Sequence, residues 1–151
     1  MCIRDRSGNA LVALPDGFGD ALENLEVLHL GGPAGDASCN RLADVPAALG
    51  RLARLRDLAL HDNALTSLPP LHGCASLATL RLDRNPLRAL PELPPTLTAL
   101  HLQGCPLPGG SEELDALPAQ VLALGPQLAD LQLPDGHHVG SFFGTPLAPR
   151  N

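Results

Sequence analysis

"LATLRLDRNPLRALPEL", residues 77–93, fits neither of the two simple periods of secondary structure. Leu80 and Leu82 would share one face of a strand, but Leu87 does not continue that alternation. A helix through the middle is excluded by Pro86, which lacks the backbone N–H that a helix needs. The stretch is therefore best understood by comparison with the rest of its own chain.

That comparison shows one unit of a repeated pattern. Written as L-x-x-L-x-L-x-x-N-x-L-x-x-L-P, the pattern matches residues 55–69 at every position and recurs 22 residues later at residues 77–91. The next unit starts 20 residues further on at Leu97 and carries Cys105 in place of the asparagine. The other matches are a tail at residues 9–15, a unit from residue 25 with seven extra residues before its asparagine, and a last unit from residue 128.

The period, with leucine and asparagine or cysteine at these offsets, resembles the leucine-rich repeat. The resemblance covers residues 9–134, about five repeats of which the first is partial, and implies an α/β leucine-rich repeat solenoid. Such a fold is curved, with short parallel strands on the concave face and irregular or short helical segments on the convex side. The alternative, a leucine-rich helical bundle, is disfavoured because 16 prolines leave little room for long helices.

Each x-L-x-L-x segment predicts a short strand, with its leucines inward and the intervening residues outward. The sharp turn that follows buries backbone N–H and C=O groups, and an asparagine amide can satisfy both kinds. This explains Asn40, Asn63 and Asn85, and the resemblance implies that they stack as a ladder. Cys105 donates only weakly, so its turn is expected to be the loosest. A short helix capped by Ser111 is expected in a later return segment.

Charge and hydropathy argue against two classes of partner. The net charge is −6, and the sequence offers neither a basic face nor an aromatic platform, which argues against nucleic-acid binding. No apolar run approaches the roughly 18 residues that span a membrane, so membrane insertion is not expected. Arginines cluster within residues 51–56 and 81–88, where solvated side chains are favoured over an anion-binding patch.

The cysteines indicate a compartment. None of the four cysteines forms a C-x-x-C pair, and the cysteine-rich caps usual in secreted leucine-rich repeat proteins are missing. Cys39 and Cys105 fall at the turn, and Cys74 occupies an apolar position of a return segment, as expected of buried free thiols. Free thiols persist in a reducing environment, which predicts cytoplasmic localisation.

The two ends depart from the pattern. Residues 1–6, MCIRDR, resemble the translation of a sequencing adapter, so residues 1–8 are expected to be an artefact or disordered. The first repeat would then be uncapped, and its exposed edge predicts self-association. Residues 135–151 lack the pattern, and a partial cap that places Phe142 and Phe143 against the last leucines is favoured over a disordered tail.

The outward strand positions are the candidate recognition site. Partners commonly bind the concave face of leucine-rich repeat proteins, and the resemblance implies the same surface here. The predicted partner-binding residues are His29, Asp57, His61, Thr79, Arg81, Asp83, His101 and Gln103. A metal site at His61, Asp83 and His101 is conceivable, since neighbouring strands lie roughly 5 Å apart, but no tight His/Cys spacing supports one.

The sequence predicts recognition without catalysis. It has no nucleophile elbow, no phosphate-binding glycine loop and no carboxylate pair with a pocket, so neither catalytic residues nor a cofactor are expected. The favoured function is a protein–protein interaction module that binds a protein or peptide partner. The alternative is the recognition domain of a larger enzyme or receptor, such as a kinase or a ubiquitin ligase, whose effector domain is missing from this fragment.

Overall fold

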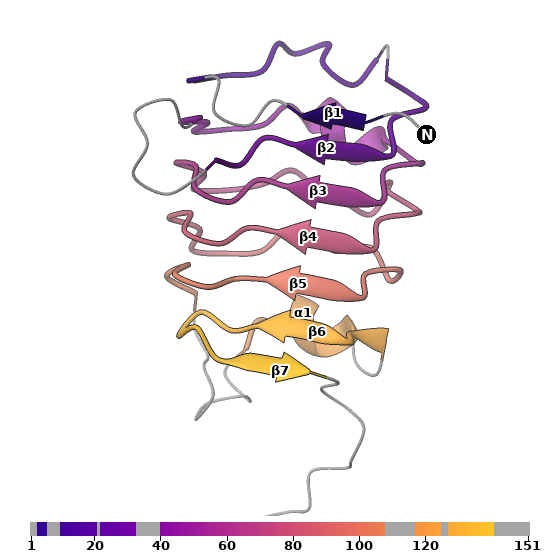
Figure 1. Ribbon diagram of the computed structural model, residues 1–151. Coiled ribbons are helices and arrows are strands. Elements are labelled where there is room, and N and C mark those ends of the chain that lie inside the picture. Colours follow the sequence, from indigo (N-terminus) through magenta and orange to yellow (C-terminus); the bar gives the residue numbers. More distant parts are fainter. Residues whose placement is uncertain are drawn as a thin grey trace, which may run out of the picture.

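The computed structural model describes residues 3–5, 10–20, 22–32, 40–107, 117–124 and 127–140, with only the backbone at 3–5 and 138–140. Within these residues the chain forms one sheet of seven short strands that lie side by side in chain order (Figure 1). The strands are β1 (Ile3–Asp5), β2 (Val27–His29), β3 (Asp57–Ala59), β4 (Thr79–Arg81), β5 (Ala99–His101), β6 (Asp130–Gln132) and β7 (His138–Gly140).

Strands β1 to β6 pair in parallel, and the leucine pattern sets their register. The central leucines of five successive strands stand opposite one another: Leu28, Leu58, Leu80, Leu100 and Leu131. Because parallel neighbours require a crossover connection, the chain returns behind the sheet between β3 and β4 and between β4 and β5, as Figure 1 shows. The parallel sheet with few helices agrees with the predicted α/β class.

The leucines of all units meet in one core. Each of the five central strand leucines is fully buried, while the residues before and after it are mostly half-buried. These leucines belong to a single cluster with those of the return segments, such as Leu42, Leu65 and Leu87. A strand of three residues cannot bury its own leucine, so each unit depends on its neighbours for burial.

The helical return segments in the described residues follow prolines. The 3-10 helix η1 (Ala47–Arg51) begins after Pro46, and α1 (Ala119–Leu124) begins after Pro118. The proline carbonyls accept the first turn's hydrogen bonds, from Leu49 at 3.0 Å and from Val121 at 2.8 Å. A proline is tolerated directly before a helix because no intrahelical hydrogen bond needs a backbone N–H at that position. The predicted cap at Ser111 lies outside the described residues.

The predicted asparagine ladder is confirmed. The Asn63 side-chain nitrogen donates to the carbonyls of Leu60 in its own unit (2.9 Å) and Leu30 in the preceding unit (3.2 Å). Its oxygen accepts the backbone N–H of Leu42 at 3.0 Å. Each such amide therefore ties its own turn to the preceding unit. Asn85 makes the same three kinds of contact, and Asn40 donates to the Leu30 carbonyl of its own unit and accepts the Leu11 N–H of the preceding one.

Cys105 continues the ladder with one donated hydrogen bond. Its thiol donates to the Leu82 carbonyl at 3.2 Å, as the asparagine nitrogens do. It has no carbonyl oxygen, so it cannot reproduce the acceptor that Asn85 offers to the Leu65 amide. Burial raises the pKa of the Cys105 thiol, which keeps it in the neutral, donating form. The expected looseness of this turn stays a prediction.

The first described strand lies where the sequence predicted no fold. The assignment of residues 1–8 as an artefact or disordered stays a prediction. Within them, β1 (Ile3–Asp5) pairs in parallel with β2, with Arg4 opposite Leu28. The leucine pattern does not reveal such a strand, because sheet pairing uses main-chain N–H and C=O groups that nearly every residue carries. β1 thus covers the edge of β2 that the repeat pattern leaves open.

The chain turns back after β6. Gly136 has φ +87°, in the left-handed region, and its N–H donates to the Leu133 carbonyl at 2.9 Å. β7 then pairs antiparallel with β6. The predicted contacts of Phe142 and Phe143 lie outside the described residues. In the described part of the chain, no helix has the length and apolar character needed to cross a membrane.

Candidate functional site

Side chains that flank the central leucines point away from the core, because successive residues of a strand face opposite sides of the sheet. Along β2–β6 they form two columns in register, and the residues two positions after the second column form a third. We call this surface the strand face. The columns are Val27, Asp57, Thr79, Ala99 and Asp130; His29, Ala59, Arg81, His101 and Gln132; and Gly31, His61, Asp83, Gln103 and Pro134.

His101 joins two carboxylates on the strand face. Its Nε2 lies 3.2 Å from Asp130 on β6, and its Nδ1 lies 3.9 Å from Asp83, which follows β4. The other Asp83 oxygen accepts the backbone N–H of Gln103 at 3.2 Å. Asp83 is only 7% exposed, so this predicted partner-binding residue is largely engaged within the fold. His101 and Gln103 keep more of their surface, and their role in binding stays a prediction.

His61 packs across the strand face onto Gly31, two residues after β2. A side chain on Gly31 would place its Cβ 2.5 Å from the His61 ring, so the imidazole occupies the space that this glycine leaves. The His61 Nδ1 also lies 2.8 Å from Asp62. The position of this predicted residue therefore depends on a small neighbour 30 residues earlier in the chain, which the repeat pattern does not specify.

An ion pair beside the ladder was missed from the sequence. Arg84 donates to both oxygens of Asp62, from Nε at 2.6 Å and from Nη2 at 2.7 Å. Both residues have positive φ, +57° for Asp62 and +53° for Arg84, and each directly precedes a ladder asparagine. The guanidinium lowers the pKa of Asp62, and the carboxylate raises the pKa of Arg84. The sequence contained one signal for this ion pair: Asp62 and Arg84 are 22 residues apart, which is the length of one repeat.

The centre of the strand face holds polar atoms without partners. Arg81 on β4 has no ion pair among the described residues, and its buried Nε has no hydrogen-bond partner there. Two other buried atoms nearby, Asp57 Oδ1 and His29 Nε2, also lack a hydrogen-bond partner among the described residues, although His29 Nε2 lies 3.5 Å from the other Asp57 oxygen. Thr79, the remaining predicted residue, is half-buried beside Asp57 in the first column.

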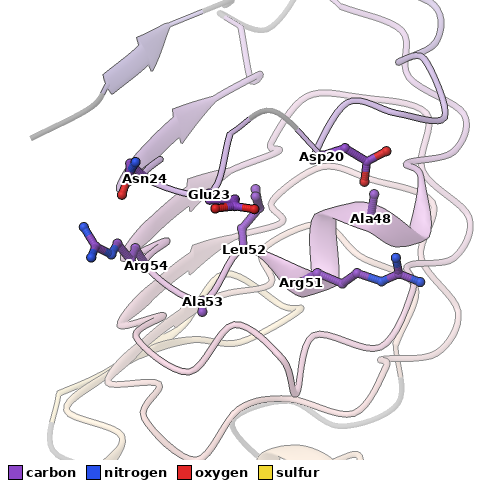
Figure 2. A pocket seen from close by; sticks show the side chains of 9 residues that line it. Asp20, Glu23, Asn24, Ala48, Arg51, Leu52, Ala53 and Arg54 are labelled. Atoms are coloured by element: carbon purple, nitrogen blue, oxygen red, sulfur yellow. The ribbon is translucent and has the colours of Figure 1, made fainter.

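A pocket of about 470 Å³ lies away from the strand face, between the segment before β2 and the segment around η1 (Figure 2). It contains two of the clustered arginines, Arg51 and Arg54, together with the carboxylates of Asp20 and Glu23. Because charges of both signs line it, the pocket has no clear preference for an anion. Among the described residues, no group of three or more His, Cys, Asp or Glu side chains could hold a metal ion.

Fold and surface together define the class: an α/β protein with short parallel strands, one shared leucine core and a polar strand face. No protein-family model matches the chain. It is 35% identical over 104 residues to Podocan-like protein 1 of Homo sapiens, across 65% of this chain and 19% of that protein. It is 44% identical over 71 residues to a leucine-rich repeat and calponin homology domain-containing protein of Drosophila melanogaster, across 47% of this chain and 8% of that protein.

The chain therefore matches less than a fifth of the length of either relative. The fly protein is named for its leucine-rich repeats, which agrees with the repeat recognised in the sequence. The match covers 47% of this chain. Both likenesses are modest and concern part of the chain.

Proposed function

We propose that residues 9–134 form a leucine-rich repeat solenoid that works as a protein–protein interaction module, with the strand face as its concave binding surface. The observation that carries the proposal is the register of β2–β6, which aligns outward polar side chains in columns while the leucines enter the core. The likeness to a protein named for its leucine-rich repeats supports a protein partner. The module performs no catalysis of its own.

The dimensions of the strand face favour a peptide or protein over a small molecule. From β2 to β6 it crosses four strand spacings, about 19 Å, which an extended peptide covers with roughly six residues. Each strand from β2 to β6 pairs with a neighbour on both sides, so its main-chain groups are not free to pair with a peptide. A partner would therefore be bound by the side chains of the columns. The shared core holds those side chains at fixed spacing, which lowers the ordering cost of binding.

Selection from a displayed random-peptide library tests this function. The wild-type chain is compared with a variant that carries Arg81→Glu and His101→Glu in the second column. A matched control carries Arg88→Glu and His72→Glu, two exposed residues off the strand face. We expect peptides selected on the wild type to bind the control and to lose binding to the strand-face variant. Equal binding to all three proteins would refute the assignment of the binding surface.

A second candidate is favoured by the length of the relatives. Each relative extends far beyond its match, and the fly protein's name includes a calponin homology domain as well as leucine-rich repeats. The chain would then be the recognition region of a larger protein, with the effector function elsewhere. Sequencing the full transcript distinguishes the two, because an effector domain in the same open reading frame supports only the second. In either case we propose that the protein acts in the cytoplasm, which fluorescence microscopy of a tagged full-length protein would test.

A further inference from the structure

In the part of the chain that the structure describes, Arg81 is the charged residue of the strand face without an ion pair. Each carboxylate of the strand face has a histidine neighbour: Asp57 lies 3.5 Å from His29, and Asp83 and Asp130 lie on either side of His101. Among the described residues, Arg81 has no such partner, and its Nε is buried without a hydrogen bond. A buried guanidinium N–H that lacks an acceptor is costly, and an incoming acceptor would remove that cost.

Asp57 offers the opposite chemistry one strand away. Its Oδ1 is buried and accepts no hydrogen bond from a described residue, although His29 Nε2 lies 3.5 Å from the other oxygen. Ala59 stands opposite Arg81, so Asp57 is one strand across and two residues back from Arg81. Strand spacing and rise then separate the Cα atoms of Asp57 and Arg81 by roughly 8 Å. That separation corresponds to about two to three residues of an extended peptide, so one short segment can reach both the unpaired donor of Arg81 and the unpaired acceptor of Asp57.

The neighbouring acidic residues do not change this complementarity. Asp83 accepts a backbone N–H from Gln103, and Asp130 contacts His101, so both already have partners. The unfilled donor at Arg81 thus selects for a group with negative charge, although the chain as a whole is acidic. A planar guanidinium favours a carboxylate, which can accept two parallel hydrogen bonds from it.

We propose that Arg81, Asp57 and His29 form the anchor of the binding surface, and that its partner is a peptide segment with an aspartate or glutamate. The carboxylate of that residue binds Arg81, and a backbone N–H of the same segment donates to Asp57 Oδ1. His29 remains beside Asp57 and offers its Nε2 to the bound segment. This inference rests on the proposed function, because it names the chemistry of the partner at the same surface.

The test uses the same random-peptide library on the 151-residue chain, on Arg81→Gln and on Arg88→Gln. We expect peptides selected on the wild type and on Arg88→Gln to be enriched in aspartate and glutamate, and those selected on Arg81→Gln to lack that enrichment. Circular dichroism and thermal unfolding should show Arg81→Gln folded like the wild type, since Arg81 has no ion pair among the described residues and its Nε makes no hydrogen bond there.

A double-mutant cycle then tests the contact itself. For a selected peptide, glutamate→glutamine and Arg81→Gln should each weaken binding by about tenfold or more, and the two losses should not add. Peptides that bind the strand face without an acidic residue, or that bind Arg81→Gln unchanged, would overturn the anchor and leave the proposed function standing. Peptides that bind the variant with Arg81→Glu and His101→Glu as tightly as the wild type would overturn both the anchor and the proposed binding surface.

Discussion

Replacing Asn85 with alanine tests the hydrogen-bond ladder most directly. The Asn85 amide donates to the carbonyls of Leu60 and Leu82, both at 2.9 Å, and accepts the backbone N–H of Leu65 at 3.2 Å. Asn85 is 1% exposed, so water cannot readily replace these partners. Each bond contributes about 0.5–1.5 kcal/mol net, and unsatisfied buried groups add to the loss, so we expect the free energy of unfolding to fall by about 3–5 kcal/mol.

Cysteine at the same position should have an intermediate effect. Cys105 shows what a thiol does at the equivalent place in the next unit, where it donates to the Leu82 carbonyl at 3.2 Å. In Asn85→Cys the thiol would keep one weak donor but leave the Leu65 N–H without an acceptor. We expect a loss of about 2–3 kcal/mol, smaller than that of Asn85→Ala.

Urea unfolding followed by far-UV circular dichroism provides the measurement, since the chain has no tryptophan or tyrosine for fluorescence. Arg88→Ala is the control, because a substitution at an exposed site should change stability by no more than about 0.5 kcal/mol. An unchanged slope of the free energy of unfolding against urea concentration would show that the same structure unfolds in each variant. A loss below about 1 kcal/mol for Asn85→Ala, or an equal loss for cysteine and alanine, would refute the ladder's role.

Three further predictions follow from the described contacts. Cys105→Asn should raise the free energy of unfolding by about 0.5–1.5 kcal/mol in the same urea assay, because the amide restores the missing acceptor. Cys74, whose pKa burial raises to about 11, should react with a thiol reagent only as fast as the protein unfolds, as measured by mass spectrometry of labelled peptides. Asp62→Asn should lower stability at neutral pH by less than about 1 kcal/mol, because half-exposed Arg84 is screened by solvent. The difference in stability between Asp62→Asn and the wild type should vanish in acid. The pKa of Asp62 is lower in the folded protein than its usual value of 3.8, so the carboxylate stabilises the fold fully above that value, and the stabilisation is lost as the pH falls through the pKa of the folded state.

Much of the fold was accessible from the sequence because each part depends on residues close in the chain. Two leucines separated by one residue identify a strand and its buried face, and β3, β4 and β5 lie where that pattern placed them. An asparagine five residues after the first strand leucine predicts a turn with buried backbone groups, and Asn63 and Asn85 satisfy those groups.

The candidate site was less predictable, because it depends on which side chains of different units meet. The columns followed from strand alternation, but the engagement of Asp83 by Gln103 and the packing of His61 on Gly31 required the register between strands. β1 was missed because its pairing uses the main chain and leaves no leucine signature.

The sequence by itself determined the repeat, the buried leucines and the outward positions, since those properties depend on spacing within a unit of about 22 residues. Only the tertiary structure decided which outward charges neutralise one another and which stay unpaired. Hydrogen bonds and ion pairs act over about 3–4 Å, so a difference of one residue in the stacking of neighbouring units changes every partner on the strand face. Arg81 is unpaired among the described residues for that reason: β3 places Ala59 opposite it, and its other strand neighbour, His101 on β5, contacts carboxylates instead.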